Sequence, residues 1–500
     1  MADQVRHDVI PASEPESKTY ASHYTLHISF PRSHIMKHSL LLLFTAILLT
    51  SCANKSMTRY ETLSPTLEKK GFEATIAEVK KEKDDLYGSN SEFLYYYDLG
   101  ILHHYNRNFD ESIKNLAQAE KIYEDLYTKS VTNEAAAVLT NDNTRPYRAR
   151  PFELLTMYQY QILNYLAKMD LDGALVEVKR SQIAMNALYQ KDKDKVNDNG
   201  YLRYLQALVY ELDGDDDEAA IAYIKAIKAF DESKMGVPKE FFEFATESLR
   251  RMEREDDIRA LKKPELASTP KATAVREQGQ EIIVLGYAGH SPILGEMYLS
   301  GTFVSAGAMN LYYKDGETGR QMSFTLVAPP VPGAGSGTFH IGFALPEVRT
   351  YKSRVSKFEV SLDNQPRVKP EKVMDVDQEL RQNMDDERNT VITRTAVRVI
   401  LRTIAAQKAK QATNTGNGIF DLLKNIAVDV GQSQLEQADL RVGLFLPHSF
   451  YMTRLPVQPG SHDVSVAAIG PHGETVGVYK FDKLSVRKGQ KVLLIVPAIK

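Results

Sequence analysis

The hydrophobic and polar positions follow different periods in the two halves of the chain. From Tyr60 to about Lys262, apolar residues recur with helical spacing, prolines are scarce, and Ala, Leu, Tyr, Lys and Glu dominate. Further along, short β-rich runs alternate with Gly and Pro turns, as in the segments 281–287, 322–327 and 357–362. The pattern predicts an α+β multidomain protein in which an all-α helical array precedes a β-sandwich-like region.

Changes in composition place the boundaries between these regions. We expect a helical domain over 52–262, a linker over the proline-containing stretch 263–275, and a β-rich region over 276–372. A helical insert over 373–437 then interrupts the strands, which return in a C-terminal β-rich region over 438–500. Residues 1–35 are polar and have no period, and we interpret them as a mis-assigned upstream extension before a start at Met36.

The segment from Met36 to Cys52 has the composition of a secretory signal. Lys37 and His38 give a positive start, and an almost unbroken apolar run of about ten residues from Leu40 follows, well short of the ~20 that span a bilayer. The run ends in Leu49-Thr50-Ser51-Cys52, which resembles the lipobox of bacterial lipoproteins. The resemblance implies cleavage of a signal peptide 36–51 and lipidation of Cys52; the alternative is a transmembrane helix with a stray cysteine.

A lipidated Cys52 would attach the mature protein firmly to a membrane, because two or more acyl chains give stable anchoring. Ala53-Asn54 follows the cysteine, and the enterobacterial sorting pattern retains lipoproteins in the inner membrane through an Asp at this place. We therefore expect the periplasmic face of the outer membrane, with the inner membrane as the alternative. Since Cys52 is the chain's one cysteine, the mature protein would have no disulfide.

The helical half contains three copies of a frame that is similar to the tetratricopeptide repeat. The small residue early in the second helix of each pair is Ser112, Ala174 or Ala219. These positions lie 62 and 45 residues apart, against about 34 in the regular repeat, so insertions or degenerate repeats are expected. The alternative is an unrelated helical bundle. Stacked helix pairs form a concave surface, which typically holds a peptide or protein.

Two groups of residues are candidates for a partner surface. Tyr95-Tyr96-Tyr97 cannot all point inward, so we take Tyr95 and Tyr97 as candidates, with ordinary packing as the alternative. Arg394, Arg398 and Arg402 recur every four residues in the helical insert and form a basic stripe suited to an anionic partner. The alternative for the stripe is a solvated face or pairing with acids elsewhere in the chain.

No motif in the chain supports an enzyme, a cofactor or a metal. The acidic run 213–218 lacks room for a calcium loop and is predicted to form a turn that caps the following helix. His290 and His448 each stand beside a serine, but no nucleophile-elbow pattern is present. The net charge of −3 indicates no nucleic-acid partner.

The segments 438–441 and 454–460, together with the lipobox and the repeats, resemble an uncharacterised family of bacterial envelope lipoproteins with N-terminal tetratricopeptide-like repeats and a C-terminal β-rich region. The family's Asp-x-Arg-x-Trp run is represented by Asp439-Leu440-Arg441 without the tryptophan. The resemblance implies a lipid-anchored periplasmic scaffold that binds envelope proteins, in cell-wall synthesis or outer-membrane assembly. The alternative is an envelope enzyme or ligand-binding protein with a site in the β-rich half, lined by His290, His340 or His448 and a carboxylate.

Overall fold

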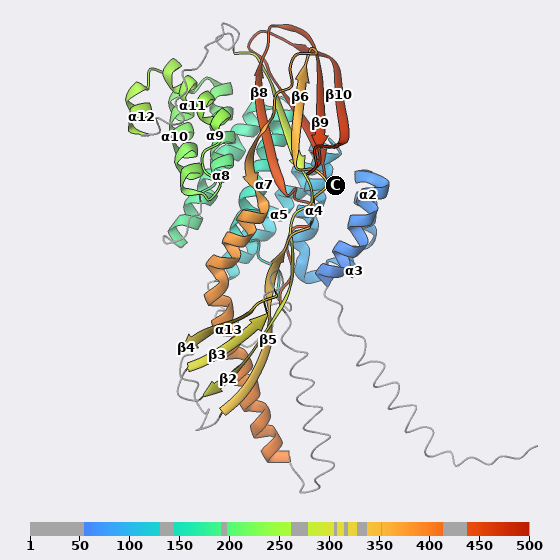
Figure 1. Cartoon of the computed structure of the whole chain (residues 1–500), viewed down its shortest axis with the longest axis vertical. Helices are drawn as coiled ribbons and strands as arrows, with labels where there is room; N and C mark the ends of the chain where they lie inside the picture. Colours follow the sequence, from blue (N-terminus) through green and yellow to red (C-terminus); the bar gives the residue numbers. More distant parts are fainter. Residues whose placement is uncertain are drawn as a thin grey trace, which may run out of the picture. The chain divides into compact units, whose positions relative to one another are not determined.

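A computed structural model describes residues 55–130, 145–191, 198–261, 279–304, 308–314, 319–327, 338–351, 353–413 and 438–499. Three predicted features lie outside these ranges: the signal peptide with Leu49, Thr50, Ser51 and Cys52, the linker 263–275, and the last part of the helical insert. Within the described ranges the chain is mixed α+β, with helices first and strands second (Figure 1). The predicted order of the two halves is confirmed.

The helical half consists of successive helices that pack against their neighbours in the chain. They are α2 (Lys55–Lys81), α3 (Lys83–Leu86), η1 (Ser89–Ser91), α4 (Glu92–Tyr105), α5 (Phe109–Ser130), α7 (Pro151–Ala167), α8 (Leu171–Lys191), α9 (Gly200–Asp213), α10 (Asp216–Glu232), α11 (Lys239–Arg251) and α12 (Glu255–Ala260). The predicted small residues Ser112, Ala174 and Ala219 are fully buried. Gly100 on α4 lies so close to α5 that an added Cβ would be 2.5 Å from Leu116 Cγ. Small residues thus allow close helix pairing.

The acidic run 213–218 forms the turn between α9 and α10, as predicted. Gly214 ends α9 with φ +79°, a left-handed conformation that favours glycine. Asp215 then caps α10, because its Oδ1 accepts a hydrogen bond from Glu218 N at 3.1 Å. The acidic run therefore forms the turn between the two helices and caps the start of α10.

The β-rich half has three sheets built from eleven described strands. The strands are β1 (Glu281–Ala288), β2 (Ile293–Val304), β3 (Ala308–Lys314), β4 (Gln321–Val327), β5 (Thr338–Arg349), β6 (Lys357–Leu362), β7 (Glu371–Asp375), β8 (Ser449–Pro456), β9 (Gly460–Ile469), β10 (Thr475–Val486) and β11 (Lys491–Ala498). The first sheet has the order β11-β1-β8-β7, the second β10-β9-β6 and the third β4-β3-β2-β5. The long helix α13 (Val376–Thr413) begins three residues later than the predicted insert, since 373–375 belong to β7.

The first sheet is covered on both faces. In β1, Ile283, Leu285 and Tyr287 belong to a hydrophobic core shared with the helices. The alternate residues Ile282 and Val284 belong to a second core shared with the second sheet. Because successive strand residues face opposite sides, the first sheet forms the middle layer between the helices and the second sheet.

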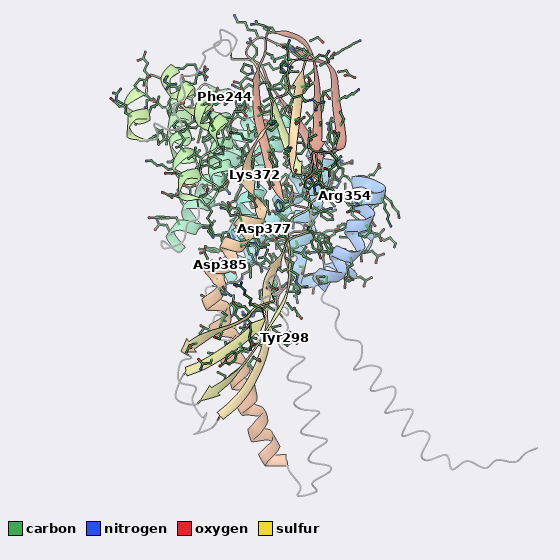
Figure 2. The ribbon with its side chains drawn as sticks, in the orientation of Figure 1. Phe244, Tyr298, Arg354, Lys372, Asp377 and Asp385 are labelled. Carbon is green, nitrogen blue, oxygen red and sulfur yellow. The ribbon has the colours of Figure 1, made fainter. Side chains whose placement is uncertain are left out.

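The third sheet and α13 have a small core of their own, and we call β2–β5 together with α13 the arm. Met297, Leu299 and Phe343 pack with Ile392 and Ala396 of α13, which runs along the strands (Figure 1). The opposite face carries Tyr298, which is labelled in Figure 2, and Tyr312. Their side chains are 67% and 46% exposed. Tyr312 stands opposite Ser300, so the two rings are diagonal neighbours on one face. Among the described residues, no helix is long and apolar enough to cross a membrane.

A buried ion network connects the helices to the first sheet. Arg454 of β8 donates from Nε and Nη2 to both oxygens of Glu281 of β1, at 2.6 and 2.9 Å. It also donates to Glu211 of α9 at 3.3 Å, and Lys491 of β11 lies 3.0 Å from the same carboxylate. The side chains of all four residues are at most 8% exposed. The neighbouring cations hold the pKa of Glu211 and of Glu281 below the usual range.

Replacing Arg454 tests the strength of this network. Arg454→Met should lower the free energy of unfolding by about 3–5 kcal/mol, because it leaves two buried carboxylates with one buried cation, Lys491. Arg251→Met is the matched control: Arg251 lies 3.3 Å from the same Glu211, but its side chain is 43% exposed. Its loss should be below about 1 kcal/mol. Urea unfolding measures both, and equal losses would contradict the network's role.

Candidate functional site

A segment of the C-terminal half without regular secondary structure lies buried against the helices, and we call residues 438–446 the threaded segment. It contains no helix or strand, yet its residues are buried or nearly so. Leu440, Phe445 and Leu446 are at most 2% exposed. Buried main-chain N–H and C=O groups need partners, and here no ladder or helix supplies them. The Ser291 amide donates to Leu446 O at 2.9 Å, and side chains supply the other partners described below.

Two buried carboxylates accept the amides at the centre of the threaded segment. Glu153 Oε1 of α7 accepts from Gly443 N at 2.8 Å, and Asp98 Oδ1 of α4 accepts from Leu444 N at 2.9 Å. Both acids are fully buried. The second oxygen of each carboxylate is also engaged: Tyr87 donates to Asp98 at 2.9 Å. Tyr147 and the Arg150 amide donate to Glu153 at 2.6 and 2.8 Å.

Cationic and phenolic side chains bind the carbonyls of the threaded segment. Arg59 of α2 donates to Val442 O, and Arg150, which precedes α7, donates to Arg441 O at 2.7 Å. Tyr105 of α4 donates to Phe445 O at 3.0 Å. The segment also provides a donor of its own, because Arg441 donates to the carbonyls of Asn90 and Arg145 at 2.9 Å. Three helices, α2, α4 and α7, and the residues that flank them thus hold one peptide backbone.

Close packing at Gly443 adds to these hydrogen bonds. A Cβ added at this position would lie 2.6 Å from Tyr97 Cε1. Tyr97 is itself fixed, because it is fully buried and its hydroxyl lies 2.6 Å from Thr156 Oγ1. The backbone of the segment and the ring of Tyr97 therefore leave no room for a side chain.

The charged side chains of this site are removed from water. Hydrogen bonds with the backbone of the threaded segment compensate for the lost hydration. Burial raises the pKa of Asp98 to about 6, although Arg59 and the Leu444 amide counteract this rise. Burial likewise raises the pKa of the Tyr87 phenol well above its usual range. Both oxygens of Asp98 and of Glu153 accept hydrogen bonds, so the arrangement holds the backbone of one peptide segment.

A second polar contact joins the two halves beside the threaded segment. His104 of α4 lies 2.7 Å from Asn164 Oδ1 through Nδ1 and 2.9 Å from the Tyr287 hydroxyl of β1 through Nε2. Burial lowers the pKa of His104 to about 4, so the ring is neutral at physiological pH. The neutral imidazole is consistent with a structural role, because it accepts one hydrogen bond and donates the other.

The structure corrects one of the two tyrosine candidates. Tyr97 was expected to offer a partner surface, but it is fully buried because its ring packs on Gly443 and α7. Tyr95 is half-buried: its ring lies 5.5 Å from that of Tyr87 and has Lys83 Nζ 4.7 Å above it. Tyr95 alone of the two keeps accessible surface.

The basic stripe on α13 is also corrected in part. Arg398 is 1% exposed and interacts within the chain, so it offers no surface to an anionic partner. Arg394 is half-buried and likewise has an interaction within the chain. Arg402 lies on α13, but its side chain is outside those described. Both arginines of the stripe with described side chains therefore interact with other groups of the same chain.

Of the candidate histidines in the β-rich half, the two with described side chains, His290 and His448, line neither of the two cavities described below. His290 Nε2 lies 3.8 Å from Glu68 Oε1, and His448 Nδ1 lies 2.9 Å from Ser449 Oγ. The side chain of His340 is outside those described. Among the described residues, no group of three or more His, Cys, Asp or Glu side chains could hold a metal ion.

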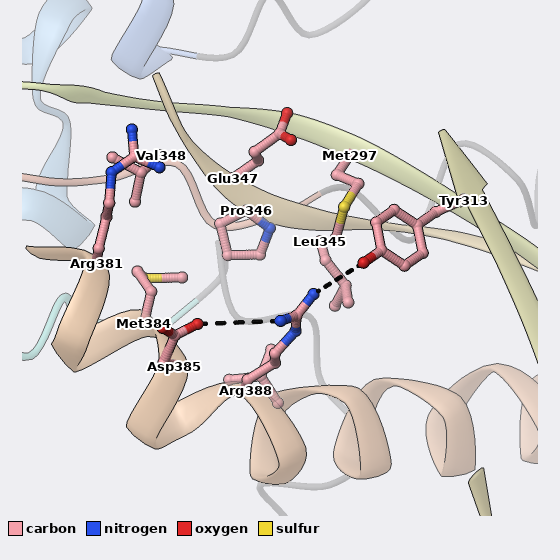
Figure 3. A pocket seen from close by; sticks show the side chains of 11 residues that line it. Met297, Tyr313, Leu345, Pro346, Glu347, Val348, Arg381, Met384, Asp385 and Arg388 are labelled. Atoms are coloured by element: carbon pink, nitrogen blue, oxygen red, sulfur yellow. Dashed lines mark hydrogen bonds and ion pairs between the residues drawn. The ribbon is translucent and has the colours of Figure 1, made fainter. Parts of the chain in front are cut away.

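A cavity of about 190 Å³ lies between α13 and the third sheet (Figure 3). Its walls are mostly apolar and come from Met297, Leu345, Pro346, Val348, Met384 and Val391. Arg388 of α13 points across it toward Tyr313, with Asp385 beside it (Figure 3). A smaller cavity beside α9 is lined by Asn199, Phe230 and Glu379 among others, and neither cavity contains a histidine.

Comparison with known proteins gives no match: no protein-family model matches the chain, and no curated protein matches it.

The sequence contained an overlooked signal for the threaded segment's site. Asp98 and Glu153 are single acids inside apolar helical runs, 95–101 and 152–155. A charge in such a place is buried only when it is paired or hydrogen-bonded, so each acid indicated a buried partner. The partner itself could not be predicted from the sequence, because Leu444 is 346 residues away from Asp98.

Gly443→Ala should destabilise the protein by about 1–3 kcal/mol, because the new Cβ overlaps the fixed ring of Tyr97. Gly477→Ala in β10 is the control, since its nearest contact would be Tyr479 Cε2 at 3.9 Å. Thermal unfolding of both variants measures the difference. A Gly443→Ala protein as stable as the control would contradict the close packing.

The raised pKa of Asp98 makes its contribution to stability depend on pH. In the folded protein the pKa of Asp98 is about 6, whereas the ordinary pKa of an aspartate is 3.8. The stabilisation is thus fully present below about pH 4 and is lost as the pH rises through about 6. Relative to Asp98→Asn, the wild type should gain about 2 kcal/mol between pH 7.5 and pH 4. Denaturant unfolding at each pH measures this, and a constant difference would contradict it.

Proposed function

We propose that the protein is a lipid-anchored scaffold on the periplasmic face of the bacterial outer membrane, attached through Cys52 and binding other envelope proteins. The observation that carries the proposal is the threaded segment. It occupies the face that α2, α4 and α7 turn toward the β-rich half, with side-chain hydrogen bonds on both sides of its backbone. The polar groups of this face hold the chain's own backbone, which makes the two halves one rigid support.

The proposal includes a tetratricopeptide-like array and a small β-sandwich. Support for the array comes from the buried small residues Ser112, Ala174 and Ala219 early in α5, α8 and α10. Support for the sandwich comes from the core that the first and second sheets share. In this proposal the inner face of the array binds the protein's own threaded segment, so partner proteins bind to another surface.

The arm is the surface that best suits a partner. Its open face combines Tyr298 and Tyr312 with the exposed small polar residues Ser300, Ser323 and Thr325. Tyrosine, serine and similar small polar residues dominate antibody binding loops, because rigid rings give contact area and small polar groups adapt to the partner. We therefore place partner binding on the arm, in cell-wall synthesis or outer-membrane assembly.

A second candidate function is ligand binding in the β-rich half, which the cavity under α13 favours. Its volume of about 190 Å³ is small against the roughly 300–1,000 Å³ of pockets for drug-sized ligands. A cofactor or metabolite of ordinary size would not fit. The scaffold is therefore the better-supported function.

Crosslinking in cells tests the scaffold. The wild type should carry labelled palmitate, fractionate with membranes and capture a defined set of envelope proteins. Cys52→Ala should lose the label and the membrane fraction, and Tyr298→Ser with Tyr312→Ser should keep both but lose the captured proteins. Recovery of no defined partner with the lipidated wild type would refute the proposal.

A further inference from the structure

The cavity under α13 has the dimensions of a site for one side chain. An engineered cavity of about 150 Å³ with apolar walls binds benzene, so about 190 Å³ accommodates one aromatic or branched aliphatic group. Two of its walls are the thioether side chains of Met297 and Met384. Methionine is flexible and polarizable, which lets such a pocket adapt to different apolar groups.

Arg388 at the edge of the cavity has unused capacity for hydrogen bonding. Its guanidinium lies 3.4 Å from the Tyr313 hydroxyl and 3.9 Å from Asp385 (Figure 3). Charge-assisted bonds are normally about 2.7–2.9 Å long, so both contacts are weak. Asp385 is a loose partner because its side chain is 65% exposed, and Arg388 itself is 45% exposed.

The other charged groups of the cavity do not compete for the same ligand. Arg381 is already bound by Asp377 at 2.8 Å and by Thr350 at 2.9 Å. Glu347 points away from Arg388 in Figure 3 and has an interaction elsewhere in the chain. The cavity thus combines an apolar wall with a polar edge, where Arg388 has only long contacts. This combination is complementary to an apolar group next to a carboxylate.

We propose that this cavity takes one apolar side chain from an extended acidic segment of a partner protein, while Arg388 binds the carboxylate beside that side chain. The inference rests on the proposed scaffold function and gives the arm a second contact site, on the α13 side of the third sheet, opposite the face with Tyr298 and Tyr312. Interfaces commonly concentrate their binding energy where one side chain fills a pocket on the partner.

Methyl NMR on the lipid-free protein, labelled with ¹³C-methyl methionine, tests the site. The signals of Met297 and Met384 are assigned with Met297→Leu and Met384→Leu. Both should shift saturably with the peptide acetyl-Phe-Asp-amide at millimolar concentration, since so small a ligand binds weakly. Acetyl-Phe-Asn-amide has the same shape without the charge and should bind about fivefold more weakly.

Arg388→Gln should abolish the difference between the two peptides, whereas Arg367→Gln should keep it. Arg367 is the matched control, because its side chain is 63% exposed and pairs with Glu359. Unchanged signals from the other methionines would show that both variants are folded. The inference is overturned if neither methyl shifts, or if the two peptides bind the wild type equally.

Failure of this inference is distinguishable from failure of the scaffold. If Arg388→Gln captures the same envelope proteins in cells as the wild type, the anchoring site is wrong and the scaffold stands. If the peptides bind as expected but the lipidated wild type captures no defined protein, the scaffold is wrong and the cavity is a peptide site with another role.

Discussion

Two carboxylates buried in the helical half accept the amides of Gly443 and Leu444, and the rest of the structure is arranged around these bonds. An extended segment in a protein interior leaves its main-chain groups unsatisfied unless side chains replace the missing ladder. Asp98 and Glu153 fulfil that need, and the backbone in turn compensates their desolvation. Neither the acids nor the segment would be stable in this place alone.

This mutual requirement explains why the two halves behave as one support. The threaded segment leads directly into β8, a central strand of the first sheet, so fixing the segment fixes the sheet. The Arg454 network and the His104 contact join the same sheet to α9 and α4. Three independent polar contacts thus fasten the middle layer to the helices. In the proposed function, these contacts support the presentation of the arm to a partner.

Periodicity and turn chemistry were enough to predict much of the fold. The acidic turn at 213–218 and the strands β1, β4 and β6 follow from local residues, whose conformations depend on near neighbours. Residues that meet distant parts of the chain were misjudged. Tyr97 was placed on the surface because its cover, Gly443, is far away in the sequence. Arg398 was a candidate for a basic partner surface, with pairing inside the chain as one alternative, and it is buried.

The central claim is that the threaded segment is part of the protein's stable core. Hydrogen exchange of the Gly443 and Leu444 amides in the native protein tests it most directly. If the buried carboxylates hold these amides, they should exchange only through global unfolding, with the same free energy as the amides of β1. Exchange through a local opening of much lower free energy, while β1 stays protected, would contradict the account.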